Sequence, residues 1–200
     1  MEQRCKKIVH KALAVVRPQF RLHFEGGIHG LPHWSRVWFH GRALAASLDV
    51  DPAVLAWFAY LHDSQRFNDS RDPAHGSRAA DFAVRLRRER VIDELNDRAF
   101  ECLCEAMRLH SDGHTTGDPT VLACWDADRL DLARVGIRPL RDRLCTPQAR
   151  HGATIDVAVK MAEGLARSVS LNPRRARDEP PQALAEAQGQ HGSHLPHGRR

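Results

Sequence analysis

Hydrophobic residues recur at helical spacing along most of the chain. In segment 2–16 they include Ile8, Leu13 and Val16, and the pattern stops before Pro18. No stretch shows the strict alternation of apolar and polar residues that a half-buried β-strand requires. We therefore predict an all-α protein, a single-domain helical bundle.

Proline and acidic residues mark where several of the expected helices begin. Proline suits the first turn of a helix, and an aspartate before it accepts hydrogen bonds from the free amide groups there. On these grounds helices are expected to open at Pro32, Asp51-Pro52 and Asp118-Pro119, the last running to Gly136. Periodicity predicts further helices over residues 74–89, 96–110 and 152–168, with loops at 21–31 and 64–73.

The segment AVLAWFAYL, residues 53–61, is apolar on every side, which is typical of a buried central helix. It ends in His62-Asp63. Burying these two ionisable side chains without partners would cost several kcal/mol, so a compensating partner is expected. A divalent cation is one such partner, and a hydrogen-bonded His-Asp pair that ends the helix is the other.

Composition separates a folded part from a tail. Residues 1–171 are predicted to form one helical domain, and residues 172–200, rich in Pro, Gly and Arg, to form a disordered tail. The tail has a net charge of only +2 and lacks aromatic residues, so we do not expect nucleic acid as a partner.

The whole chain carries a formal net charge of +5, with both signs interleaved along it. Its five cysteines show no disulfide-like framework, so a reducing cytoplasm is expected. No apolar run is long enough to cross a bilayer, and the N-terminus does not have the pattern of a secretory signal. Thirteen histidines are many for 200 residues and direct attention to metal binding.

Three aspartates, Asp126, Asp128 and Asp131, interrupt the apolar segment 121–135. On a helix the side chains of Asp126 and Asp128 point about 200° apart, so one of the two is expected to approach the interior. Asp131 is expected to lie on a solvated face, paired with Arg134 or Arg129.

Separate predicted helices carry His33, His62-Asp63 and Asp128. Two imidazoles and two carboxylates would form a mixed nitrogen and oxygen site of net charge −2. Such a site balances one divalent ion and suits Mn²⁺, Fe²⁺, Mg²⁺, Ni²⁺, Co²⁺ or Zn²⁺ better than a thiolate-bound ion.

This ordered set resembles the HD-domain superfamily of metal-dependent phosphohydrolases, over about residues 28–140. The matching segments are HWSRV at His33, FAYLHDSQRF at His62-Asp63, HGSRAADFA at His75, RLHSDGH at His110 and DADRLDLARVGI at Asp128. The DADRLD phrase is similar to that of some small bacterial members. The resemblance implies that the metal ligands are His33, His62, Asp63 and Asp128, with Asp126 as the reserve for Asp128.

The resemblance also implies roles for three further residues. His75 and His110 would hold a second metal ion or contact a phosphate, although helix capping and a helix-dipole contact would also explain them. Arg66 stands near the lysine with which many relatives meet the substrate phosphate, but Ser64-Gln65-Arg66 departs from the commoner form of that stretch. No role is expected for His29 or His40.

The resemblance implies hydrolysis of a phosphate ester, in a nucleotide or a small phosphorylated metabolite, by water activated on the metal ion. Asp63 would orient that water, and Arg66 would stabilise the charge that develops on the phosphate. Two other functions stay open at this stage. One is iron-dependent oxygenation by a two-metal version of the same fold, and the other is a non-catalytic metal- or nucleotide-binding regulatory module.

Overall fold

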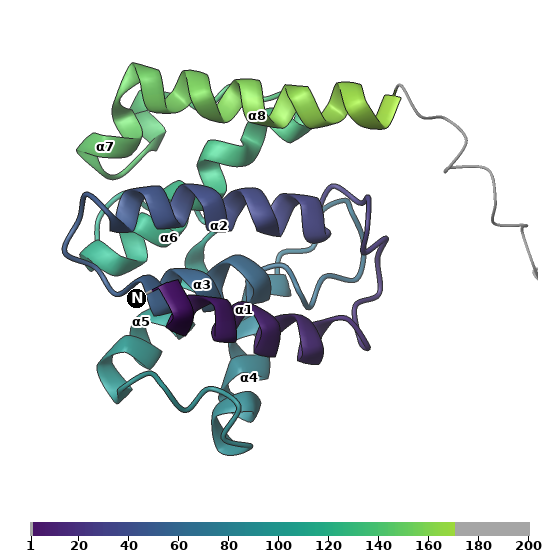
Figure 1. Ribbon diagram of the computed structural model, residues 1–200, viewed down its shortest axis with the longest axis vertical. Helices are drawn as coiled ribbons and strands as arrows, with labels where there is room; N and C mark the ends of the chain where they lie inside the picture. Colours follow the sequence, from purple (N-terminus) through teal and green to yellow (C-terminus); the bar gives the residue numbers. More distant parts are fainter. Residues whose placement is uncertain (1, 171–200) are drawn as a thin grey trace, which may run out of the picture. The chain divides into compact units, whose positions relative to one another are not determined.

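Helix α3 (Pro52–Leu61) lies at the centre of the bundle (Figure 1), and it packs against helices that precede it and helices that follow it in the chain. The computed structural model describes residues 2–170, with side chains through residue 164, and every regular element in that range is helical. The all-α prediction is therefore confirmed. The elements are α1 (Glu2–Val16), α2 (Leu31–Ala45), α3 (Pro52–Leu61), α4 (His75–Arg88), α5 (Asp97–Leu109), α6 (Pro119–Arg129), η1 (Leu130–Val135), η2 (Arg141–Arg143), α7 (Pro147–Arg150) and α8 (Gly152–Ser170).

The predicted start signals act as expected at two helices. The side chain of Asp51 accepts a hydrogen bond from the amide of Ala53, and that of Asp118 accepts one from the amide of Thr120. The helix that begins at Pro119 changes to 3₁₀ geometry at Leu130, which the sequence did not predict. The short helix α7 was not predicted either.

The core surrounds α3 on all sides. Every residue from 53 to 61 is buried, and α3 packs against α1, α2, α5 and α6. The fully buried tryptophans Trp34, Trp57 and Trp125 fill the space between these helices. His62 and Asp63 follow directly on α3, so the chain carries them into the middle of the bundle.

Helices α4 and α5 approach each other closely at Gly76. A Cβ atom at this position would collide with the carbonyl oxygen of Met107 and would lie only 3.2 Å from the Nδ1 atom of His110. Glycine is therefore the residue that allows this contact. The contact brings His75, at the start of α4, beside His110, at the end of α5.

The first compact unit of the chain extends through Ala166. The second begins at Arg167, and within it the structure describes only residues 167–170 at the end of α8. The predicted tail, residues 172–200, lies outside the described residues. Among the helices that are described, none is both long enough and apolar enough to cross a membrane.

Candidate metal centre

Three elements bring the first group of predicted ligands together. The Nε2 atoms of His33, on α2, and His62, at the end of α3, lie 3.1 Å apart. Oδ1 of Asp128, on α6, lies 3.4 Å from the first of these nitrogens and 3.7 Å from the second. Oδ2 of Asp63 lies 3.6 Å and 3.5 Å from the same two nitrogens. His33, His62 and Asp128 are close enough to share one metal ion.

The second oxygen of Asp63 faces another pair of histidines. Its Oδ1 atom lies 3.1 Å from Nε2 of His75 and 3.7 Å from Nε2 of His110, and these two nitrogens are 2.8 Å apart. His62, Asp63 and His110 also have the spacing of a metal-binding group. Asp63 therefore lies between two clusters. The first cluster contains His33, His62 and Asp128, and the second contains His75 and His110. One carboxylate oxygen of Asp63 faces each cluster.

The other ring nitrogen of each histidine is already engaged. Nδ1 of His62 lies 3.0 Å from the carbonyl oxygen of Phe58, and Nδ1 of His110 lies 2.7 Å from that of Met107. Nδ1 of His75 contacts the carbonyl oxygen of Asp72 in the same way. A carbonyl oxygen only accepts hydrogen bonds, so each Nδ1 donates, and each Nε2 faces Asp63, where it can carry a proton or bind a cation.

This arrangement fits a bound metal ion. Two pairs of imidazole nitrogens face each other at 3.1 and 2.8 Å, and facing lone pairs repel unless a proton or a cation lies between them. Histidines that donate through one ring nitrogen and ligate through the other are the usual arrangement at metal sites. Imidazole and carboxylate donors suit Mn²⁺, Fe²⁺, Co²⁺, Ni²⁺ and Zn²⁺.

Burial and charge set the protonation of the cluster in the absence of metal. Burial lowers the pKa of His62 to about 3, so this ring is neutral at pH 7. Burial would also lower the pKa of His33, but the carboxylates of Asp128, Asp131 and Asp63 outweigh it and raise that pKa to about 9. The surrounding histidines hold the pKa of Asp63 well below its ordinary value despite its burial.

Arg66 lies at the edge of the second cluster. Its Nη1 atom is 3.4 Å from Oδ1 of Asp63 and 3.2 Å from Nε2 of His75. Its other nitrogens donate to the carbonyl oxygens of Asn68 and Ser70, at 3.2 and 2.7 Å. The loop after α3 therefore fixes the guanidinium beside the metal donors.

The expectation for Asp131 was wrong. This side chain is fully buried, and it accepts hydrogen bonds from Nδ1 of His33 at 2.7 Å and from Nε of Arg36 at 2.6 Å. Arg134 does lie near it, at 3.9 Å, but Arg129 donates to the carbonyl oxygen of Arg143 instead. Asp131 orients a predicted metal ligand, a role suggested only by its position one helical turn after Asp128.

Asp126 is not a reserve ligand. Its carboxylate accepts three hydrogen bonds of 2.7 Å, from the amides of Cys145 and Thr146 and from the Thr146 hydroxyl. It anchors the segment before α7 and points away from the metal donors. The two side chains diverge as their spacing on a helix requires, and Asp128 is the one that faces the cluster.

His29 lies closer to the candidate metal centre than expected. It is 8% exposed, its Nδ1 atom is 2.8 Å from Oδ1 of Asp69, and its ring meets that of His33 edge-on at 6.5 Å. No local pattern signals the contact between His29 and Asp69, because the two residues are 40 positions apart. His29 is a neighbour of the donors and is not itself within their group.

A comparison with protein-family models, with curated proteins and with solved structures finds no match to this chain. The resemblance to the HD-domain superfamily therefore stays a prediction from the sequence. The geometry of the buried His/Asp cluster is the main guide to function.

Proposed function

We propose that this protein is a metal-dependent phosphohydrolase that cleaves a phosphate ester of a nucleotide or a small phosphorylated metabolite. One observation carries the proposal, namely the convergence of four imidazole Nε2 atoms on the two oxygens of Asp63. Two clusters that share one carboxylate are suited to hold two cations a short distance apart. Such pairs of ions stabilise both the attacking and the leaving oxygen in phosphate hydrolysis.

The residues divide between two ion positions. His33, His62 and Asp128 would hold the first ion, His75 and His110 would hold the second, and Asp63 would contact both. A bound divalent ion supplies a water of lowered pKa and polarises a phosphoryl oxygen. Asp63 and Asp128 stay charged at neutral pH because the neighbouring histidines lower their pKa values despite burial.

Arg66 is placed to bind the phosphate group. Its Nη1 atom faces the cluster, 3.4 Å from Oδ1 of Asp63, and the N–H groups of this nitrogen could bind a phosphate oxygen. The carbonyl oxygens of Asn68 and Ser70 hold it in position, so little ordering is needed when a substrate binds. Positive charge at this point would stabilise the charge that develops on the equatorial oxygens.

Substrate would approach from the side of Asp128. The side chain of Asp128 is 16% exposed, whereas that of His33 is fully buried and that of Asp63 is 3% exposed. The buried donors exclude most water, which strengthens their interaction with an anionic substrate. Asp63 is positioned to orient the attacking water through the same carboxylate that faces both clusters.

The direct test is turnover by the full chain after removal of metal and reloading with Mn²⁺, Mg²⁺, Fe²⁺, Co²⁺, Ni²⁺ or Zn²⁺. Substrates are p-nitrophenyl phosphate, bis(p-nitrophenyl) phosphate and a panel of nucleotides. We expect hydrolysis with at least one ion, and a loss of about a thousandfold or more in the His62→Ala/Asp63→Ala double variant. His10→Ala, a change of an exposed histidine on α1, serves as the matched control and retains activity.

Undiminished hydrolysis in the double variant would contradict the proposal. The oxygenase alternative uses the same donors, because imidazole and carboxylate groups also suit iron. It predicts a protein that purifies with iron, shows an oxygen-dependent absorbance change and hydrolyses no ester of the panel. A regulatory module predicts metal binding without either activity.

A further inference from the structure

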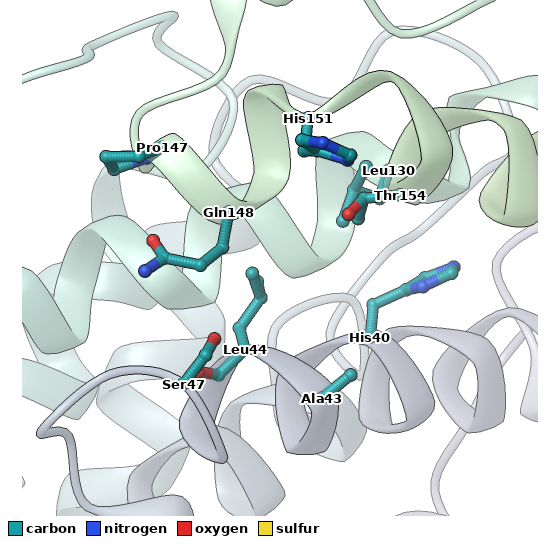
Figure 2. A pocket seen from close by; sticks show the side chains of 9 residues that line it. All are labelled: His40, Ala43, Leu44, Ser47, Leu130, Pro147, Gln148, His151 and Thr154. Carbon is teal, nitrogen blue, oxygen red and sulfur yellow. The ribbon is translucent and has the colours of Figure 1, made fainter.

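Hollows lie against two opposite faces of helix α2. One cavity lies between α2 and the turn that joins α7 to α8, and its lining includes His40 and Gln148 (Figure 2). Nε2 of His40 and Oε1 of Gln148 make no hydrogen bond with any residue that the structure describes, but the two side chains point apart in Figure 2 and indicate no common ligand. The other hollow lies on the far face of α2, beside α1, and its lining carries charge.

This second hollow is a groove between α1 and α2, both of which pack against α3. Its volume is about 450 Å³, in the range of sites for one small organic molecule. The side chains that matter here are Cys5, Lys6 and Val9 from α1 and Trp38 and Arg42 from α2.

Most of the groove is apolar. Cys5 is buried, and Val9, Trp38 and Pro52 are half-buried along its length. Burial raises the pKa of the Cys5 thiol, so this group is uncharged at pH 7. The apolar part of a ligand would leave water here and would lie against an indole ring, which offers a large and rigid contact surface.

One positive charge at the rim of the groove lacks a counter-ion. Nζ of Lys6 pairs with the carboxylate of Glu2 at 2.8 Å, and Nδ1 of His10 donates to the carbonyl oxygen of Lys6. Arg42, in the last turn of α2, forms no ion pair and its side chain makes no hydrogen bond within residues 2–164. A planar guanidinium matches a carboxylate in geometry as well as in charge.

The neighbouring Glu2 limits the charge of the ligand. Its hydrogen bond with Lys6 lowers the pKa of Glu2, so this carboxylate is ionised at pH 7. An anion with a single charge would meet the free guanidinium of Arg42, whereas a second negative charge would also meet Glu2.

We propose that the groove binds a small amphipathic carboxylate, whose charged end pairs with Arg42 and whose apolar part lies against Trp38 and Val9. This inference does not rest on the proposed phosphohydrolase function. The predicted metal ligand His33 precedes Arg42 by nine residues on α2, a spacing that places the two side chains on opposite faces of the helix. Titration in the presence of EDTA therefore examines the groove without the metal centre.

The experiment is titration of the full chain, in EDTA, with octanoate, followed by tryptophan fluorescence and by calorimetry. Trp38 is half-buried, whereas the other three tryptophans, Trp34, Trp57 and Trp125, are fully buried. We expect saturable binding with a fluorescence change. In Trp38→Phe, which keeps an aromatic ring in the groove, most of that change is expected to disappear while calorimetry still detects binding.

The charge of the ligand is tested from both sides. Arg42→Leu is expected to weaken octanoate binding by about fivefold or more, and Arg88→Leu, a change of an exposed arginine on α4, leaves it unchanged. Octanamide keeps the chain without the charge, and it is expected to bind the unaltered protein at least about fivefold more weakly than octanoate. This comparison does not depend on the folding of a variant.

Three results would overturn the proposal. The first is absence of saturation by octanoate. The second is equal affinity for octanoate and octanamide, or an affinity for octanoate that Arg42→Leu does not change. The third is a full fluorescence change in Trp38→Phe, which would place the ligand away from the groove.

Discussion

The chemical role of each buried carboxylate depends on the group that meets it. Asp131 meets Nδ1 of His33 and the guanidinium of Arg36, so it fixes the ring that turns its other nitrogen toward the metal donors. Asp126 lies five residues earlier and is equally buried, but it meets backbone amides. On the proposed function, the first carboxylate influences metal binding, whereas the second stabilises the fold.

This difference predicts opposite phenotypes for two matched substitutions. Asp131→Asn is expected to weaken Mn²⁺ or Zn²⁺ binding about 10- to 100-fold, because the charge behind His33 is lost. Asp126→Asn is expected to lower the free energy of unfolding by about 1 to 3 kcal/mol, since hydrogen bonds to a charged acceptor are weakened, with metal affinity unchanged. Calorimetric titration with metal and urea unfolding measure the two effects. Equal loss of metal affinity in both variants would refute the distinction.

At the scale of elements, the second cluster exists because α4 and α5 meet at Gly76. His75 and His110 each lie at a helix terminus and belong to different helices, so the distance between their rings depends on how closely the two backbones approach. The glycine makes this approach possible because a side chain there would meet the backbone of α5. The first cluster instead depends on α2, α3 and α6.

Gly76→Ala is therefore expected to destabilise the protein by about 1 to 3 kcal/mol and, on the proposal that the clusters hold two ions, to reduce the number of bound metal ions from two to one. Gly164→Ala is the control, because a methyl group at that exposed position of α8 would meet no described atom beyond its own stretch of helix within 4 Å. It is expected to stabilise the helix by up to about 1 kcal/mol and to leave the metal count unchanged. Urea unfolding and metal analysis of the dialysed proteins give both quantities. Two bound ions in Gly76→Ala would contradict this account of the α4–α5 contact.

For the whole molecule, the proposed metal centre links stability to metal and to pH. In the metal-free protein the pKa of His33 is about 9, above the ordinary value of 6.5. The protonated ring thus stabilises the fold below pH 6.5, and this stabilisation is lost as the pH rises through 9. Metal binding requires Nε2 of His33 without a proton, so metal affinity increases as the pH rises from 6.5 to 9.

We therefore expect saturating Mn²⁺ or Zn²⁺ to raise the midpoint of thermal unfolding, and to raise it more at pH 8.5 than at pH 6.5. An ion at a hundred times its Kd contributes about 2.7 kcal/mol, which corresponds to roughly 5 to 10 °C for a protein of this size. EDTA is expected to reverse the shift. Calorimetric scans with and without EDTA at both pH values test this, and a larger shift at pH 6.5 would contradict it.

Local sequence was sufficient for most of the helices. The caps at Asp51 and Asp118 and the apolar stretch before His62 act within a few residues, so they could be recognised from the chain alone. The change of helix type at Leu130 and the short helix α7 were missed. The segment before α7 depends on longer-range contacts, such as the hydrogen bonds that Asp126 accepts from the amides of Cys145 and Thr146.

The sequence by itself determined the helical class, the buried central helix and the residue types available for metal binding, because periodicity and side-chain chemistry are local properties. Only the tertiary structure decided which oxygen of Asp63 faces which histidines, that Asp131 orients His33, and that His40 is left without a partner beside a cavity. These relations join residues that lie up to 98 positions apart, as His33 and Asp131 do. They arise from the way in which α2, α3, α5 and α6 pack around one another, and no local pattern encodes that packing.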